Sequence, residues 1–312
     1  MSAKQLKPSY AYHAEYVKEK NIKKLFSTNE MIAQPKYDGE RLLVHFDNGN
    51  TYCTSRRISK KTNRFNELQD NLPTFHATLD LDYTVLDGEI YSKDWATVAG
   101  ITKSLPERAL MLQQENEAKY VVFDCLFFDG EDVRELPYFE RLKLAKIVVN
   151  KLNKPHMHII ESTPVNSIEH GIALMNEYIK QGFEGSVLKH LNMAYDEKYA
   201  ILKLKKSITV DCVVYDKVQG NGKYTNTVGA LKLGYYDPET NEIVHITQCA
   251  PGSDADRDNW RDSWEELKLS VVEVKCQELT KTSMRHPVIV RLRHDKTYKM
   301  CTRETIFNEE QK

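Results

Sequence analysis

The sequence feature that most constrains this chain is the polar stretch at residues 36–41, Lys-Tyr-Asp-Gly-Glu-Arg. It lies between two apolar runs, residues 31–33 and 42–46, which have the composition of strands entering and leaving a turn. Asp38-Gly39 suits a tight turn, because glycine tolerates positive φ and aspartate bonds to its own backbone. Taken alone, the stretch predicts a hairpin corner with solvated charges. The alternative is a functional site, in which strand ends hold Lys36 as a nucleophile for phosphate, with Arg41 as a fixed guanidinium.

Composition places the chain among ordinary folded proteins. Its 312 residues suffice for two domains, and 41% apolar with 29% charged residues excludes a disordered chain. The formal net charge of -1 argues neither for nor against a nucleic-acid partner. The six cysteines are scattered without a C-x-x-C pair, which disfavours a disulfide scaffold or zinc site and favours a reducing cell interior. No apolar run has the length of a membrane span, and the first ten residues lack the apolar core of a signal peptide.

Strand and helix patterns are mixed over the first two thirds of the chain. The expected helices cover residues 10–26, 106–117, 139–152 and 167–181. The helix over 139–152 should bury Leu142, Ile147 and Val148, and the last helix should end at Gly182. The expected strands cover residues 31–33, 42–46, 51–54, 83–91, 120–128, 185–188 and 200–205, with an Asn48-Gly49 hairpin turn before the third. Strands with helical layers predict an α+β domain.

The pattern changes near Lys206-Ser207, where short alternating strands and glycine-containing turns begin. The strands expected beyond this point cover residues 208–218, 230–236, 243–248, 271–277 and 288–291, with one helical insert at 256–267. This pattern predicts a small β-barrel, and an OB-fold suits its size.

Polar clusters recur at the strand ends in a fixed order. They are Lys36 with Arg41, Ser55-Arg56, Asp87-Gly88-Glu89, Phe123, Glu184-Gly185, Lys203 with Lys205, and Arg293-His294-Asp295-Lys296. The series resembles the motifs of the covalent nucleotidyltransferases, which comprise ATP-dependent DNA ligases, RNA ligases and mRNA capping enzymes. It runs from Gln34 to Lys296, nearly the whole chain. Lys203-Leu204-Lys205-Lys206 and Met284-Arg285-His286-Pro287 are most similar to small bacteriophage DNA ligases.

The resemblance implies an ATP-dependent DNA ligase that seals 3′-OH/5′-phosphate nicks in duplex DNA through a lysyl-AMP and an adenylylated DNA intermediate. It implies a nucleotidyltransferase (adenylation) domain of antiparallel sheets with helices at residues 1–206 and an OB-fold domain at 207–312. Lys36 would carry AMP, and Glu89 and Glu184 would hold Mg²⁺. The residues expected to bind ATP or its phosphates are Gln34, Arg41, Arg56, Glu89, Phe123, Lys203, Lys205, Arg293, Asp295 and Lys296.

Each residue type also has a chemical reason and a plainer alternative. Lys203 and Lys205 alternate on one strand, so they share a face and put positive charge beside Lys36 and the α-phosphate; the alternative is a solvated edge strand. The carboxylates suit Mg²⁺ but also suit surface salt bridges. Phe123 lies in an apolar strand, where a core position is the default, and only the resemblance makes it a platform for adenine.

Other enzymes with the same lysine chemistry are the nearest alternative: an RNA ligase, or an mRNA capping guanylyltransferase that uses GTP. A non-catalytic OB-fold protein that binds nucleic acid is a further alternative, although it does not need Lys36, Glu89, Glu184 and Lys203 together. About thirty residues precede Gln34, so we expect a minimal two-domain enzyme without a helical DNA-binding domain. The expected partner is nicked double-stranded DNA, with no membrane. The expected state is a monomer in the cytoplasm of a bacterial or phage-infected cell.

Overall fold

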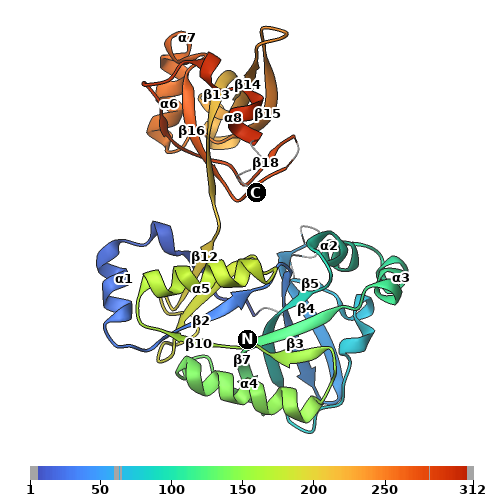
Figure 1. The fold of residues 1–312 in the computed structure, drawn as a ribbon. Coiled ribbons are helices and arrows are strands. Elements are labelled where there is room, and N and C mark those ends of the chain that lie inside the picture. Colours follow the sequence, from blue (N-terminus) through green and yellow to red (C-terminus); the bar gives the residue numbers. More distant parts are fainter. Residues whose placement is uncertain (1–5, 60–62, 64, 281, 308–312) are drawn as a thin grey trace. The chain divides into compact units, whose positions relative to one another are not determined.

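The chain divides into two compact units, Met1–Lys205 and Lys206–Lys312. The computed structural model describes residues 6–59, 63, 65–280 and 282–307, and its elements are labelled in Figure 1. Each unit has its own apolar core. Among the described residues, none of the helices is long and apolar enough to cross a membrane.

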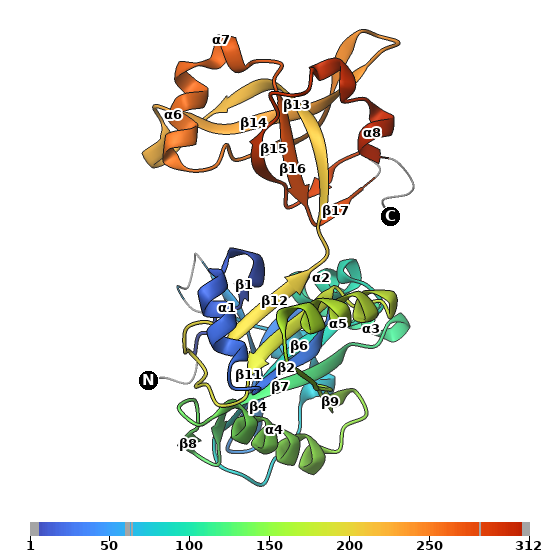
Figure 2. The same ribbon diagram turned by 60° about the vertical axis from the view of Figure 1, so that its left-hand side comes forward.

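The first unit contains a five-stranded sheet in the order β1-β12-β11-β2-β10. Its strands are β1 (Tyr12–His13), β12 (Ile201–Lys205), β11 (Gly185–His190), β2 (Met31–Lys36) and β10 (Thr163–Val165). All neighbours are antiparallel except β1 and β12. One face of this sheet is apolar, because Ala33, Leu188, Leu202 and Leu204 alternate along the strands and pack against helices α1 (Glu19–Phe26) and α5 (Ile168–Lys180). Figures 1 and 2 show α5 lying across the sheet.

A seven-stranded sheet forms the rest of this unit, in the order β5-β4-β3-β6-β7-β8, with β9 also pairing with β7. Its strands are β5 (Phe65–Glu67), β4 (Asn50–Ile58), β3 (Glu40–Asp47), β6 (Thr84–Tyr91), β7 (Lys119–Phe128), β8 (Glu131–Asp132) and β9 (Met157–Ile159). Helices α2 (Trp95–Lys103), α3 (Pro106–Glu115) and α4 (Tyr138–Leu152) contribute to the core on one face. The Asn48-Gly49 turn is confirmed: both residues have positive φ, and Asp47 pairs with Asn50.

Three local expectations for this unit are wrong. The helix expected over residues 10–26 begins only at Glu19, because residues 12–13 pair with β12 as a strand. Ile147 is 43% exposed, since the inward face of α4 instead carries Arg141, Ala145, Val148 and Val149. The hairpin reading of residues 36–41 fails as well: β2 and β3 belong to different sheets, so residues 37–39 connect the two sheets.

The second unit is built on an antiparallel sheet in the order β15-β14-β13-β16-β19. Its strands are β13 (Ile208–Gln219), β14 (Val228–Asp237), β15 (Glu242–Cys249), β16 (Val271–Cys276) and β19 (Val288–Leu292), and β17 (Glu278–Leu279) pairs separately with β18 (Met284–Arg285). Its helices are α6 (Asp254–Asp262), α7 (Trp264–Leu267) and α8 (Arg303–Phe307). The sequence-predicted strands and helical insert are confirmed. The described chain is therefore a mixed α+β protein whose sheets are mainly antiparallel.

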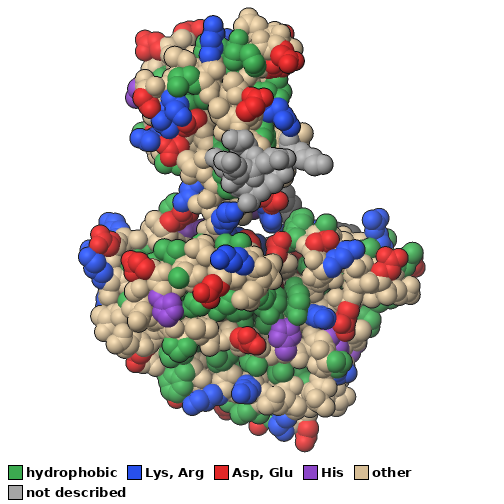
Figure 3. Space-filling model, viewed as in Figure 1, with side chains coloured by type: hydrophobic (Ala, Val, Ile, Leu, Met, Phe, Trp, Pro, Cys, Tyr) green, Lys and Arg blue, Asp and Glu red, His purple; other side chains and the backbone are tan. Residues whose placement is uncertain are grey.

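All six cysteines are buried free thiols. Figure 3 shows one face of the molecule, on which Lys and Arg side chains are interspersed with Asp and Glu over each unit. This mixture agrees with the formal net charge of -1.

Candidate active site

The register of the five-stranded sheet brings three predicted lysines onto one face. Lys36 of β2 pairs with Gly185 of β11, and Gly185 pairs with Lys205 of β12. One step further along, Val187 lies between Gln34 and Lys203 in the same way. Residues paired across neighbouring strands project to the same side, so the three lysines stand opposite the apolar face.

Glu184 holds two of these lysines. One carboxylate oxygen contacts Lys36 Nζ, the other contacts Lys205 Nζ, and the Glu184 backbone N–H donates to the Lys36 carbonyl at 2.8 Å. Burial would raise the pKa of Glu184, but Lys36 and Lys205 outweigh it and hold that pKa below its ordinary value. With its side chain 18% exposed, Glu184 is a partly buried ion-pair centre rather than a surface salt-bridge partner.

Gly185 permits this close arrangement. A Cβ at this position would lie 2.2 Å from the Leu204 carbonyl oxygen, so any side chain would push β11 away from β12. The distance between Glu184 and the two lysines therefore depends on a glycine in the central strand.

Lys203 adds a third ammonium group to the face. Burial lowers its pKa, and Lys205, Lys36 and Arg56 lower it further. Lys203 also lines a cavity of about 650 Å³ together with Arg41, Arg56 and Tyr10. Arg56 lies on β4 with its side chain exposed, and it forms no ion pair with any residue that the structure describes.

Glu89 lies on the other sheet, opposite Arg41 in the pairing of β6 with β3. Burial raises its pKa to about 7; Lys36 and Arg41 act in the opposite direction, while Glu184 adds to the rise. The backbone of Gly39 lies close to β6. A Cβ on Gly39 would lie 2.0 Å from the Ile90 carbonyl oxygen and 2.9 Å from Glu89 Cγ. Gly39 does not have positive φ, so this approach, and not turn chemistry, requires glycine.

Arg41 is committed to an internal ion pair. Its Nε and Nη2 donate to the two oxygens of Asp87 at 2.9 and 2.5 Å, and further N–H groups donate to Ser9 and to Tyr195 Oη. Burial would lower the pKa of Arg41, but Asp87 outweighs it and raises that pKa. Arg41 is thus a rigidly oriented guanidinium at the wall of the cavity, not a free one.

Phe123 occupies a β-bulge in β7. The register with β6 shifts between the Asp87–Asp124 pair and the Gly88–Val122 pair, which leaves Phe123 as an extra residue. Its partly exposed ring lies 5.3 Å from the Arg41 guanidinium carbon and 4.6 Å from Lys189 Nζ. The default core position does not hold, because the bulge turns the ring away from the core that contains Val122 and Cys125.

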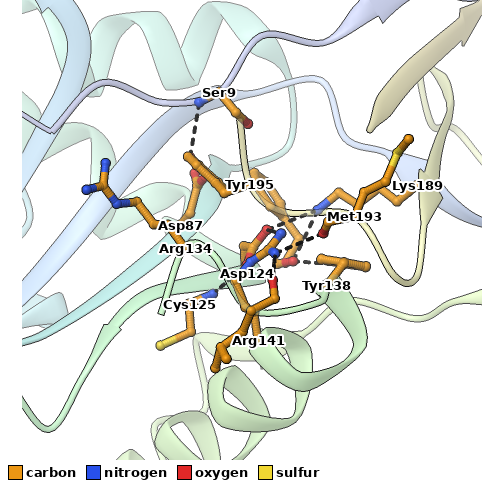
Figure 4. Close-up of polar contacts among 12 residues, drawn as sticks. Ser9, Asp87, Asp124, Cys125, Arg134, Tyr138, Arg141, Lys189, Met193 and Tyr195 are labelled. Carbon is orange, nitrogen blue, oxygen red and sulfur yellow. Dashed lines mark hydrogen bonds and ion pairs between the residues drawn. The ribbon is translucent and has the colours of Figure 1, made fainter. Parts of the chain in front are cut away.

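A buried polar cluster that contacts the Phe123 carbonyl was missed from the sequence. Figure 4 labels its members Asp124, Tyr138, Arg141 and Lys189. Arg141 of α4 forms two hydrogen bonds with Asp124 at 2.8 and 3.1 Å. Lys189, only 4% exposed, donates to the Phe123 carbonyl at 3.2 Å and lies over the Tyr138 ring. Burial lowers the pKa of Lys189 to about 7. The available signal was a charged residue, Asp124, inside an otherwise apolar strand, because a buried charge requires a partner.

Gln34, expected near the base, is 1% exposed. Its Nε2 donates to Tyr138 Oη at 2.7 Å and to Ser162 Oγ at 3.0 Å.

The predicted residues of the second unit form their own charged cluster. Asp211 of β13 accepts from Arg293 Nη1 at 3.1 Å and from Lys296 Nζ at 2.6 Å. Arg293 also donates twice to Asp295, at 2.8 and 2.7 Å. Asp211 was missed because it lies more than eighty positions from the motif that it holds.

A sequence profile described as "ATP dependent DNA ligase domain" matches residues 12–205, which include the Lys36, Glu184 and Lys205 strands. The chain belongs to this ATP-dependent DNA ligase family. The resemblance to covalent nucleotidyltransferases is therefore confirmed at the level of the family.

Curated relatives of this ligase family member include a DNA ligase of vaccinia virus (strain Ankara), which is 26% identical over 87% of this chain and 57% of the viral protein. A DNA ligase of Sulfurisphaera tokodaii is 26% identical over 77% of this chain and 42% of the relative. The chain thus spans about half the length of the curated relatives it matches.

Solved structures resemble this ligase family member in fold. One from a structure–function study of Lig E DNA ligases has a TM-score of 0.66 and 17% identity, covering 92% of this chain and 99% of the other. Another, named Pmar-Lig_PreS3, has a TM-score of 0.68 and 18% identity, covering 92% and 67%.

Proposed function

We propose that this chain is an ATP-dependent DNA ligase that seals 3′-OH/5′-phosphate nicks, with Lys36 as its nucleophile. The observation that carries the proposal is the position of Lys36 within a ligase-family domain: it ends a strand beside Glu184, on the face that also carries Lys203 and Lys205. Rigid strands hold these groups, as a site that positions a phosphate requires.

In the first step, the neutral Lys36 amine would attack the α-phosphorus of ATP. The N–P bond forms, the bond from that phosphorus to the bridging β-phosphate oxygen breaks, pyrophosphate leaves, and the amine loses a proton. Lys203 and Lys205 would oppose the negative charge on the phosphate oxygens. AMP would then pass to the nick 5′-phosphate, and the 3′-OH would displace it to close the backbone.

Mg²⁺ fits the carboxylates of Glu89 and Glu184. No group of three or more His, Cys, Asp or Glu side chains is placed to hold a metal within the part of the chain that is described. Mg²⁺ does not need such a cage, because it commonly uses one or two carboxylates together with substrate phosphates and water. The two candidates are Glu89 of β6 and Glu184, which directly precedes β11. When bound, Mg²⁺ would neutralise phosphate charge.

The nucleotide would lie over the bulge. Phe123 would stack on adenine, Glu89 would reach the ribose, and Gln34 would contact the base. Arg56, exposed at the cavity that Arg41 and Lys203 also line, would take phosphate charge, with Arg41 as a fixed neighbour.

Residues 1–206 would form the adenylation domain and 207–312 an OB-fold domain. The five antiparallel strands of the second unit and its helical insert support an OB-fold. Arg293, Asp295 and Lys296 would orient the leaving pyrophosphate. The partner would be nicked duplex DNA, bound by a monomer in the cytoplasm of a bacterial or phage-infected cell.

Labelled nucleotide tests the proposal. With ATP and Mg²⁺ the protein should gain one AMP on Lys36, measured by intact mass, and pyrophosphate should remove it. The adduct should be absent in Lys36→Ala, and an adduct surviving there would refute the assignment. GTP as the efficient donor would indicate a capping enzyme instead.

A nicked duplex with a labelled 5′-phosphate then tests the DNA partner. Sealing should fall steeply as the salt concentration rises, because each phosphate contact adds roughly 0.9 to the slope of log affinity for DNA against log salt concentration. Adduct formation needs no DNA and should change little. Equal salt dependence of the two reactions would argue against DNA binding through phosphates.

A further inference from the structure

The side-chain amide of Gln34 has two different ends, and its orientation decides which base it accepts. The nitrogen end carries two hydrogen-bond donors, and the oxygen end carries an acceptor. Gln34 lies on the same face of β2 as Lys36, two residues before it. An amide in this position can present either end to a bound base unless its surroundings hold it.

Both donors of this amide are already used. Nε2 donates to Tyr138 Oη at 2.7 Å and to Ser162 Oγ at 3.0 Å. Oε1 accepts no hydrogen bond from any residue that the structure describes. The oxygen is therefore the end of Gln34 left to receive a donor.

Tyr138 makes this orientation obligatory. A tyrosine hydroxyl has one proton, and Tyr138 donates its proton to the Phe123 carbonyl at 2.8 Å. Burial raises the pKa of Tyr138, so the hydroxyl keeps that proton. With the amide reversed, Tyr138 would have to donate to Gln34 Oε1 and would face the Phe123 carbonyl oxygen without a proton between them.

The β-bulge explains why that carbonyl needs the proton. Phe123 has no ladder partner in β6, and its carbonyl accepts from Tyr138 Oη and Lys189 Nζ instead. The ring proposed to stack on adenine and the amide of Gln34 are thus joined through one hydroxyl group. Tyr138 and Lys189 are labelled in Figure 4.

We propose that Tyr138 determines purine selectivity by holding Gln34 so that Oε1 accepts from the 6-amino group of adenine and repels the 6-oxo group of other purines. Tyr138 is a positioning residue, since it acts through Gln34. The proposal rests on the proposed function, because it requires a purine nucleotide to bind beside Lys36. It distinguishes ATP from ITP and GTP by one group, the substituent at position 6 of the ring.

The test compares ATP with ITP as donors for labelling Lys36, because these nucleotides differ at position 6 and ITP lacks the 2-amino group of GTP. The wild type should prefer ATP by about 30-fold in kcat/KM, because the 6-oxo oxygen of ITP would face the buried acceptor Gln34 Oε1 without a proton between them. Tyr138→Phe keeps the ring but frees the amide, so the preference should fall to about 3-fold or less. Tyr120→Phe is a matched control: it also removes a buried hydroxyl bonded to carbonyl oxygens, those of Leu42 and Leu86, and should retain the wild-type preference.

Gln34→Glu separates orientation from other effects. A carboxyl group has oxygen at both ends, so in this background Tyr138→Phe should no longer change the ATP/ITP ratio. A ratio that falls equally in both backgrounds would overturn the proposal. Should Tyr138→Phe fail to fold, Ser162→Ala replaces it, because Ser162 Oγ is the second acceptor of the Gln34 amide. An ATP/ITP ratio unchanged in Ser162→Ala would also overturn the proposal.

The outcomes distinguish this inference from the proposed function. A wild type that labels Lys36 with ATP and ITP equally well retains the function and overturns the role of Tyr138. A wild type labelled by no nucleotide refutes the function, and with it the inference.

Discussion

The carboxylate of Glu184 lies between Lys36 and Lys205, with one oxygen on each ammonium group. Glu184→Gln would remove the carboxylate that pairs with both ammonium groups, beside a third at Lys203. We expect AMP-adduct formation to fall by about 100-fold and the free energy of unfolding at pH 7 to fall by about 1–3 kcal/mol. Because the folded-state pKa of Glu184 is lowered, its stabilisation is present above the ordinary value of 4.5 and is lost as the pH falls below it.

Urea unfolding at pH 7 and at pH 4 measures this difference, which should be smaller at pH 4. Glu19→Gln is the control, because its pair with Lys23 is exposed and should contribute little to stability at either pH. A loss for Glu184→Gln that is the same at both pH values would contradict the ion-pair explanation.

Glu89 has the opposite pH dependence. Burial raises its pKa from 4.5 to about 7, so its contribution to stability is complete below pH 4.5 and is lost as the pH rises through 7. Glu89→Gln should therefore raise the free energy of unfolding by about 1–3 kcal/mol at pH 8 and change it little at pH 5.

Adduct formation by Glu89→Gln should nevertheless fall at both pH values, if Glu89 helps to hold Mg²⁺ and the ribose. Thermal unfolding across a pH series and intact mass measure the two effects. A variant that is destabilised at pH 8 would show that the carboxylate is not strained in the folded protein.

Asp87 and Arg41 form a buried bidentate pair, and Asp87 is fully buried. Asp87→Ala leaves the Arg41 guanidinium without its carboxylate, which should cost about 3–5 kcal/mol of unfolding free energy. Asp132→Ala removes the partner of Arg134 at a more exposed site and should cost about 1 kcal/mol or less. Urea unfolding compares them, and equal costs would mean that Arg41 is satisfied without Asp87.

Arg293, Lys296 and Asp211 allow the reaction steps to be separated. Pyrophosphate leaves only in the first step, so Arg293→Ala and Lys296→Ala should slow adduct formation by about 100-fold and sealing of a pre-adenylylated nick far less. Asp211→Asn should have the same pattern, because Asp211 accepts hydrogen bonds from both side chains. His294→Ala, between them in the sequence, is the control and should leave both rates unchanged. Equal loss in both steps would exclude a role for these residues with pyrophosphate.

Local patterns in the sequence determined most of the elements. Alternation predicted the strands of the second unit. Asn48-Gly49 predicted the β3–β4 hairpin of the first unit, because positive φ is a property of single residues. The resemblance carried by the motifs singled out Lys36, Lys203 and Lys205, which one sheet face brings together. The strands and the turn depend on backbone preferences and on period, which neighbouring residues specify.

Only the tertiary structure decided how those residues are engaged. Residues 37–39 connect two sheets, Gly39 is required by close approach to Ile90, and Arg41 is bound by Asp87. Tyr138 and Lys189 act on Phe123 from other elements, at a bulge that no local signal announces. The physical reason is that a buried polar group must find its partner wherever the packed chain supplies one, and those partners are set by sheet register and packing between residues far apart in sequence.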